Sequence, residues 1–249
     1  MPLRRHAQAL AQRTLGPAHP AALKRWRRLQ AAARARRVGR LTRDFVAWHG
    51  LTVSGGPFAG LSYPDATATS LVPKLLGAYE RVLHAAVEEA VRAAPELIVN
   101  VGAADGYYAV GLARRCPGAT VRAFEADAGQ RALLTRVAAA NATRLEVGGL
   151  AGPGDLEALP PGTLVVMDCE GCERALLQPE TLRDAAILVE LHDFVEPGVS
   201  DVIVERFRAT HHVTLIETAS QPPERGSALG LALSEHRPGP MRWAVLRPA

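Results

Sequence analysis

The chain has 249 residues, of which 48% are hydrophobic and 5% aromatic, a length that suits one α/β domain with an extension and is short for two equal domains. It contains neither the run of about 20 apolar residues that a membrane span needs nor an apolar segment near its start that is typical of a secretory signal. Three cysteines are too few for a disulfide framework, so we expect a soluble, cytoplasmic protein.

Charge is distributed unequally along the chain. Residues 1–43 contain twelve Lys and Arg and no acidic residue, whereas the remainder contains 17 basic and 25 acidic residues. An acidic main domain argues against a nucleic-acid groove on that domain, although a basic arm can still contact anions.

The first predicted helix covers residues 21–38, where Leu23, Trp26 and Leu29 recur at roughly helical spacing. Three interpretations stay open for it. It is a helix packed on the main domain with a solvated basic face, a flexible or partner-binding arm, or an organelle transit peptide or membrane-surface helix.

Residues 50–66 form a Gly- and Pro-rich connector with room for two short strands. A helix is then expected over residues 71–93, ended by Pro95. Its apolar stripe consists of Leu75, Leu76, Tyr79, Leu83 and Val87. We therefore divide the chain into a basic extension with connector, residues 1–69, and a main domain, residues 70–249.

From residue 96 onward, short apolar strands alternate with helices. Strands are expected over residues 97–101, 120–125, 145–148, 164–168, 187–192, 213–218 and 243–247. Helices are expected over residues 107–115, 128–141, 172–177 and 199–210, and a long polar loop, a candidate lid, over 220–240. Repeated β–α units predict a Rossmann-like, mostly parallel seven-stranded sheet flanked by helices. Ligands bind such sheets beyond the carboxyl ends of the strands, where the strand order reverses.

The first of these strands runs into a glycine-containing turn. Gly102 and Gly106 permit a tight turn and a close approach of the backbone to a ligand at the N-terminus of the next helix. Glu125 follows 23 residues after Gly102 and ends the second strand, where a carboxylate can accept both hydroxyls of a ribose. A dinucleotide fingerprint would need Gly where Ala104 and Tyr107 stand. The pattern therefore favours S-adenosyl-L-methionine (SAM), which has no pyrophosphate, over NAD.

Other polar residues near this turn are candidate cofactor contacts. Asn100 and Asp105 either reach the methionine end of SAM or hold the turn and the helix N-terminus. Asp155 either lies near the adenine or caps a helix, and the sequence leaves both interpretations open. The expected cofactor contacts are Asn100, Gly102, Ala103, Asp105, Gly106, Tyr107, Glu125, Asp155 and Asp168.

Acidic residues and a histidine follow the fourth and fifth strands. Because adjacent strands lie about 4.8 Å apart, Asp168 and His192 can face one crevice, with Glu190 on the same face as His192. Methyl transfer to a hydroxyl needs a base, and we expect His192 to serve, with Asp168 orienting the acceptor and Glu170 positioning it. The alternatives are a structural role for His192 and, less favoured, a divalent cation held by Asp168, Glu170 and His192.

Cys169 and Cys172 have the C-x-x-C spacing that also occurs in zinc and redox sites. The sequence has no second pair, and Cys116 is distant along the chain. We therefore expect two small side chains that pack near the end of the fourth strand, with metal or redox chemistry as the alternative.

The main domain resembles the FkbM-type methyltransferase family over about residues 70–248. The matching segments are Pro73-Lys-Leu-Leu-Gly-Ala-Tyr-Glu80, Val101-Gly-Ala-Ala-Asp-Gly-Tyr-Tyr108, Ala123-Phe-Glu-Ala-Asp127, Val166-Met-Asp-Cys-Glu-Gly-Cys-Glu173 and Leu188-Val-Glu-Leu-His192. The resemblance implies a class I SAM-dependent fold and O-methylation of a natural-product or sugar hydroxyl.

The resemblance also implies roles for individual residues. It assigns Gly102, Gly106 and Glu125 to the cofactor, puts Asp168 and Glu170 at the rim, and places Tyr63, Tyr79 and Glu80 where they close the pocket. Asn100 and Ala104 depart from the family pattern, which bears on the details of cofactor contact and not on the cofactor's identity. Cys169 and Cys172 stand where the family usually has Val and Ala, which supports the packing interpretation.

The sequence thus predicts a SAM-dependent O-methyltransferase for a small-molecule or glycan acceptor. An N-methyltransferase, a non-catalytic SAM-fold module whose basic leader docks a partner, and a nicotinamide-dependent oxidoreductase are the alternatives. A homodimer stays open.

Overall fold

The computed structural model describes residues 20–218 and 241–249. The chain divides into two compact units, Met1–Asp44 and Phe45–Ala249. The polar loop expected over residues 220–240 lies outside the described residues, as does the beginning of the basic extension.

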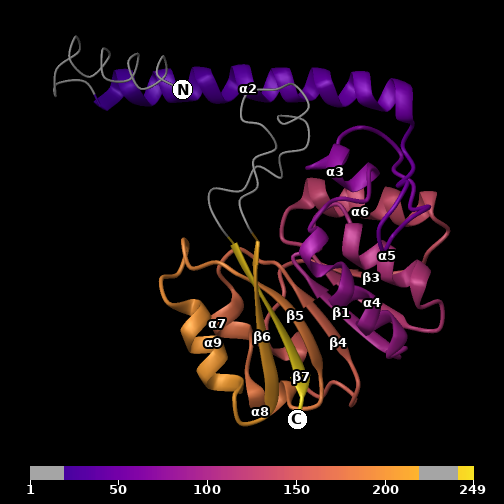
Figure 1. The fold of residues 1–249 in the computed structure, drawn as a ribbon, viewed down its shortest axis with the longest axis vertical. Coiled ribbons are helices and arrows are strands. Elements are labelled where there is room, and N and C mark those ends of the chain that lie inside the picture. The colour runs from indigo at the N-terminus through magenta and orange to yellow at the C-terminus, as the bar shows by residue number, and fades with distance from the viewer. Residues whose placement is uncertain (1–19, 219–240) are drawn as a thin grey trace. The chain divides into compact units, whose positions relative to one another are not determined.

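Helix α2 (Pro20–His49) is longer than the helix predicted over residues 21–38 (Figure 1). Proline suits the first helical position because its missing N–H has no intrahelical partner there. The helix continues through Gly39 and stops at Gly50, which has a φ of 84° and donates its backbone N–H to the carbonyl of Val46. Across the described ranges, no helix is both long and apolar enough to cross a membrane.

Within the described residues, seven strands form one sheet in the order β3-β2-β1-β4-β5-β7-β6. Their bounds are β1 Leu97–Val101, β2 Thr120–Phe124, β3 Glu146–Gly148, β4 Leu164–Met167, β5 Ala186–Leu191, β6 His211–Thr218 and β7 Met241–Pro248. Strands β1 to β5 pair in parallel, whereas β7 pairs antiparallel with both β5 and β6. The expected Rossmann-like, mostly parallel seven-stranded sheet is confirmed.

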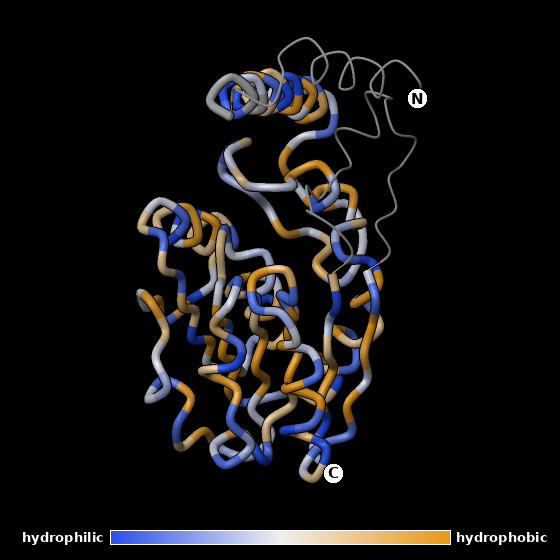
Figure 2. The backbone as a smooth tube through the Cα atoms, turned by 90° about the vertical axis from the view of Figure 1, so that its left-hand side faces the viewer, coloured by the Kyte–Doolittle hydropathy of each residue, from blue (hydrophilic) through white to orange (hydrophobic). Residues whose placement is uncertain are grey.

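Apolar clusters cover both faces of the sheet, because successive strand residues point to opposite sides. Ile98, Val166 and Leu188 belong to one cluster, and their strand neighbours Val99 and Val165 belong to the other. The first cluster includes residues of α4 (His84–Arg92), α5 (Tyr107–Arg115) and α6 (Ala128–Ala140). The second includes residues of α7 (Glu173–Leu176), α8 (Pro179–Leu182) and α9 (Val199–Phe207). Hydrophobic segments run along the strands, and hydrophilic ones occur at the loops (Figure 2).

The single helix predicted over residues 71–93 is wrong. The chain instead forms α3 (Leu71–Leu75), the 3₁₀ helix η1 (Arg81–Leu83) and then α4. The break includes Gly77, where φ is 65° and a Cβ atom would lie 2.1 Å from the backbone carbon of Gly55. The connector thus packs directly on this turn, and an uninterrupted helix would remove the close approach. The two short strands expected in the connector reduce to one bridge, between Thr52 and Ser62.

Candidate active site

The switch point of the sheet lies between β1 and β4, because the strand order runs outward from β1 in one direction and from β4 in the other. The turns after these two strands touch directly. A Cβ atom on Gly102, where φ is 75°, would lie 1.7 Å from the backbone oxygen of Asp168. The Asp168 N–H donates to the carbonyl of Val101 at 2.9 Å. A glycine is therefore required at residue 102 to join the two turns, whether or not a ligand is bound.

The turn after β1 leads into α5 through Gly106, which has a φ of 91°. A Cβ atom there would lie 2.5 Å from Cδ1 of Leu134 on α6, so this glycine lets α5 and α6 pack closely. Ala103 and Tyr107, both predicted cofactor contacts, are 5% and 4% exposed and belong to the core. The residues predicted as cofactor contacts therefore lie in one turn, but the side chains of Ala103 and Tyr107 are buried in the core.

Glu125 lies directly after β2 and clamps this turn. One of its carboxylate oxygens accepts the backbone N–H of Ala104, and the other accepts that of Asp127, both at 2.8 Å. An ionised carboxylate has about four acceptor positions. Glu125 therefore keeps the capacity to accept further hydrogen bonds, such as those of two ribose hydroxyls.

Asn100 is buried in β1 and is only partly satisfied. Its side-chain N–H₂ donates to the carbonyl of Val166 on β4 at 3.1 Å, whereas its Oδ1 atom has no hydrogen-bond partner within the described residues. Buried polar atoms without a partner are uncommon and call for an explanation such as a ligand or a water molecule. Asn100 is the last residue but one of β1, so this oxygen lies close to the switch point of the sheet.

Asp105 is fully buried at the N-terminus of α5. Its carboxylate accepts the backbone N–H of Tyr107 at 3.2 Å and binds Nζ of Lys74 at 2.5 Å. Lys74 is also buried, and its ammonium group lies 5.0 Å and 5.6 Å from the ring centroids of Tyr79 and Tyr107. Sequence reasoning missed Lys74 as a site residue. Its place in an apolar helix, where a cation must find a partner, was the available signal.

The tyrosines and the glutamate that the resemblance placed near the pocket lie around the start of α5. Tyr108 donates a hydrogen bond to the buried carboxylate of Glu80. Burial and the charge of Glu80 together raise the pKa of Tyr108 well above its ordinary value. Burial, together with the charge of Asp105, does the same to the pKa of Tyr63. Both phenols therefore stay protonated at neutral pH.

A second polar group surrounds His192 at the end of β5. Its Nδ1–H donates to the carboxylate of Glu173, which is completely buried. Its Nε2 atom lies 3.4 Å from Oδ1 of Asp168 and 3.4 Å from Oε2 of Glu190. The expected meeting of Asp168, Glu190 and His192 at the rims of β4 and β5 is therefore confirmed.

The electrostatics of this group differ from the expectation that His192 is a base near neutral pH. Burial by itself lowers the pKa of His192, but hydrogen bonds to Glu173 and Glu190 and the charge of Asp168 outweigh it and raise the pKa from 6.5 to about 10. Burial and the charges of Glu190 and Glu80 raise the pKa of Asp168 well above its ordinary value. At neutral pH the His192 side chain is therefore an imidazolium cation with both ring nitrogens protonated, and in this state it cannot act as a base.

The structure moves Glu170 away from its expected place and decides between the two interpretations of Asp155. The side chain of Glu170 is exposed, because its backbone adopts a φ of 51° in the turn after β4, and it does not belong to the group around His192. Glu190, and not Glu170, joins Asp168 and His192 in this group. Asp155 accepts the backbone N–H of Gly152 at 2.8 Å and so caps the 3₁₀ helix η2 (Pro153–Leu156), which matches the capping interpretation.

The packing interpretation of Cys169 and Cys172 is incomplete, because the two residues also form a disulfide, which the sequence did not predict. Their Cα atoms are 5.7 Å apart, within the range that a disulfide allows. Both side chains also pack against the second core cluster. A pair three residues apart closes only a short loop, so it needs no wider framework of cysteines.

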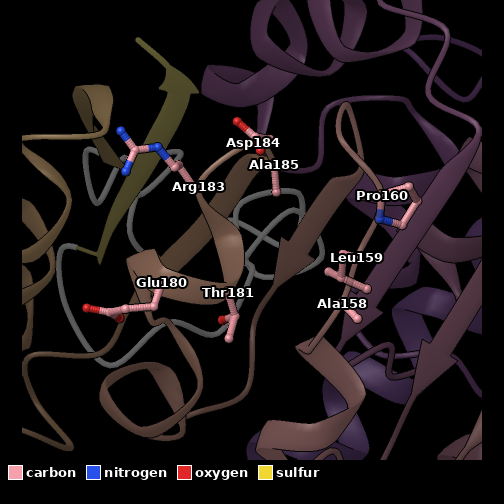
Figure 3. Close-up of a pocket in the computed structure, with 8 residues that line it drawn as sticks. All are labelled: Ala158, Leu159, Pro160, Glu180, Thr181, Arg183, Asp184 and Ala185. Atoms are coloured by element: carbon pink, nitrogen blue, oxygen red, sulfur yellow. The ribbon is translucent and has the colours of Figure 1, made fainter.

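A pocket of ≈ 330 Å³ lies at the opposite edge of the sheet, in the segments that precede β4 and β5. Its lining residues are Ala158, Leu159, Pro160, Glu180, Thr181, Arg183, Asp184 and Ala185. In Figure 3 the charged ends of Glu180 and Arg183 extend away from Leu159 and Pro160 and do not converge on the hollow. We therefore place the candidate site at the carboxyl ends of the strands, where the buried polar residues gather.

Comparisons with known proteins add structural likenesses. No family model and no curated protein matches the sequence, so the resemblance to the FkbM-type family stays a prediction. A putative methyltransferase from Escherichia coli is 16% identical with a TM-score of 0.48, and the match covers 80% of this chain and 98% of that one. An O-methyltransferase from Bacillus cereus in complex with SAH is 15% identical with a TM-score of 0.46, covering 64% and 78%. A precorrin-6y C5,15-methyltransferase from Geobacter metallireducens is 12% identical with a TM-score of 0.47, covering 65% and 86%. At these values the likenesses assign neither a family nor an activity to this chain.

Proposed function

We propose that this chain is a SAM-dependent methyltransferase that methylates a hydroxyl group of a small molecule, natural product or sugar. The observation that carries the proposal is the hydrogen bonding of the turn after β1. Its backbone N–H groups already have partners at residues Gly102, Ala103, Ala104, Gly106 and Tyr107. A pyrophosphate needs such donors to be free at the helix N-terminus. The turn therefore suits a nucleoside cofactor without phosphates better than a dinucleotide.

The polar groups of the site support the same cofactor. The carboxylate of Asp105 already accepts the Tyr107 N–H at the N-terminus of α5, and its charge is paired with that of Lys74. SAM has no phosphate that would need this helix N-terminus. Glu125 keeps acceptor capacity for ribose hydroxyls.

The group around His192 supplies what an acceptor hydroxyl needs. Asp168 is the most accessible of its carboxylates, with 31% of its side chain exposed. In methyl transfer the acceptor oxygen bonds to the methyl carbon while the carbon–sulfur bond breaks, and S-adenosylhomocysteine leaves. Asp168 would orient the hydroxyl and take its proton, and His192 would hold Asp168 in place through its Nε2 atom.

The cofactor is tested by calorimetric titration with S-adenosylhomocysteine and, separately, with NAD. We expect micromolar binding of S-adenosylhomocysteine. A Glu125→Gln variant should weaken this binding about 10- to 100-fold, because hydrogen bonds to a charged group contribute about 1.5–3 kcal/mol. A Glu146→Gln variant is the matched control, since that exposed glutamate on β3 pairs only with Arg122 on the neighbouring strand. Binding of NAD instead of S-adenosylhomocysteine would overturn the proposal.

The reaction is tested with a panel of hydroxyl and amine acceptors. An Asp168→Asn variant should bind S-adenosylhomocysteine as the wild type does and lose about 10²- to 10⁴-fold in turnover, the usual contribution of a positioned base. Turnover on amines alone would replace O-methylation by N-methylation. Full turnover in the Asp168→Asn variant would refute the role given to this carboxylate.

A further inference from the structure

We propose that Asp168, Glu190 and His192 bind one divalent metal ion of the Mn²⁺ type. One atom from each side chain, two carboxylate oxygens and an imidazole nitrogen, lies within 4.8 Å of the other two. Ligands about 2.1 Å from a common ion lie about 3.0–3.4 Å apart when the angle at the ion is between 90° and 109°. The two separations of 3.4 Å from Nε2 of His192 match this range.

The backbone fixes this arrangement. Asp168 directly follows β4, whereas Glu190 and His192 lie two residues apart along β5, so that both point to one face. Val166 and Leu188 are register partners in the β4–β5 pair, which brings the ends of the two strands to the same edge of the sheet. The three donors are therefore positioned by paired strands and not by a mobile loop.

Glu173 provides an observation independent of the three donors. This completely buried carboxylate accepts the Nδ1–H of His192 and so turns Nε2 toward Asp168 and Glu190. The ion would displace the second proton, which His192 carries at Nε2 at neutral pH, because a metal ligand must be deprotonated. A metal-binding histidine usually donates its other ring N–H to a carboxylate or carbonyl in this way. One carboxylate would be enough to hold a structural histidine, yet this imidazole is approached by three.

The donor set indicates the class of ion. Two carboxylates and one imidazole suit first-row divalent ions such as Mn²⁺ and Zn²⁺, which accept mixed oxygen and nitrogen ligands, better than Ca²⁺, which prefers oxygen ligands alone. Sequence reasoning considered a different set, with Glu170 in place of Glu190, but Glu170 is exposed and outside the cluster. Because Asp168 is partly exposed, an acceptor oxygen could complete the coordination. This catalytic use rests on the proposed methyl transfer, whereas the binding of the ion does not.

Mn²⁺ titration followed by electron paramagnetic resonance tests the site on the full chain, stripped with chelator and without cofactor or acceptor. Mn²⁺ is the probe because, unlike Zn²⁺, it has little affinity for sulfur ligands, and Cys116 is a free cysteine. We expect one bound ion per chain. A Glu190→Gln or Asp168→Asn variant should weaken binding more than about 100-fold, and Glu173→Gln about 10- to 100-fold. Circular dichroism and thermal melting establish that each variant is folded.

Glu170→Gln is the matched control, since it alters a carboxylate in the same turn as Asp168 but outside the cluster. It should bind Mn²⁺ as the wild type does. Absence of stoichiometric binding, or equal losses in the Glu170→Gln and Glu190→Gln variants, would overturn the proposal. A chain that binds Mn²⁺ but not S-adenosylhomocysteine would refute the proposed methyltransferase and support the metal site. A chain that binds S-adenosylhomocysteine but not Mn²⁺ would support the proposed cofactor and refute the metal site.

Discussion

Lys74 and Asp105 form an ion pair in the interior of the main domain, with 2.5 Å between Nζ and Oδ2 and side-chain exposures of 4% and 1%. Lys74 belongs to α3, before the sheet, and Asp105 to the turn that follows β1. The pair therefore ties the segment upstream of the sheet to the proposed cofactor turn.

Replacing one partner of this pair should be costly. A Lys74→Met variant leaves the buried carboxylate of Asp105 without its cation, so urea unfolding should show a loss of about 3–5 kcal/mol. The control is Arg136→Met, which breaks the exposed Arg136–Asp65 pair of 2.8 Å and should cost less than about 1 kcal/mol. Equal losses in the two variants would contradict the role given to Lys74. A Lys74→Met/Asp105→Asn double variant should lose less than the sum of its single changes.

The contact between the turns after β1 and β4 predicts a sharp difference between two glycines. A Gly102→Ala change puts a Cβ atom 1.7 Å from the backbone oxygen of Asp168, so the two turns must separate. We expect a loss of more than about 3 kcal/mol or failure to fold. A Gly118→Ala change meets no atom within 4 Å and should alter stability by less than about 1 kcal/mol. Thermal melting of both variants checks this, and a stable Gly102→Ala protein would refute the contact.

The buried His211 should make the fold sensitive to mild acid. Burial lowers its pKa, although the hydrogen bond to the carbonyl of Ala185 and the charge of Asp184 act in the opposite direction. Above pH 6.5 the imidazole is neutral in both the folded and the unfolded states. Below pH 6.5 the unfolded chain takes up a proton that the folded chain does not, so stability falls toward the lowered pKa, by at most about 1.4 kcal/mol per pH unit.

Urea unfolding of the wild type between pH 7 and pH 5 measures this slope. A His211→Gln variant, although less stable throughout, should have a shallower slope than the wild type. His212→Gln is the control because that neighbouring imidazole is exposed, and its slope should match the wild type. Parallel slopes for the wild type and His211→Gln would remove His211 as the cause.

The Cys169–Cys172 disulfide should contribute modestly to stability. It closes a loop of about four residues, for which the loss of chain entropy in the unfolded state corresponds to about 2 kcal/mol. Unfolding with and without a reducing agent measures the contribution. The stability of a Cys169→Ser/Cys172→Ser variant should not change with the reducing agent. If the variant loses as much stability as the wild type on reduction, the disulfide is not the cause of the loss. Mass spectrometry after alkylation should find neither cysteine alkylated before reduction and both alkylated after it.

Local patterns in the sequence were enough to locate the seven described strands, because most of them contain a short apolar run next to turn residues, as in Leu97–Val101. They were not enough for contacts between distant segments. The break at Gly77 depends on Gly55, and the burial of Lys74 depends on Asp105, which lies 31 residues further on.

The same distinction applies within the candidate site. Strand alternation correctly put Glu190 beside His192, since that rule is local. It could not indicate that Glu170 turns outward, because this depends on a left-handed backbone conformation at a residue other than glycine. Nor could it find Glu173 as the partner of Nδ1, since helix α7 must first fold back against β5.

The antiparallel insertion of β7 between β5 and β6 has a consequence for folding. Strand β5, which carries Glu190 and precedes His192, pairs through Ile187 with Leu246, far along the chain. Any intermediate without β7 leaves one edge of β5 open, and an open apolar edge is prone to pair with another chain. Because such distant pairing is slow, the last event in folding would complete the site. Conditions that delay this step should therefore favour aggregation over completion of the site.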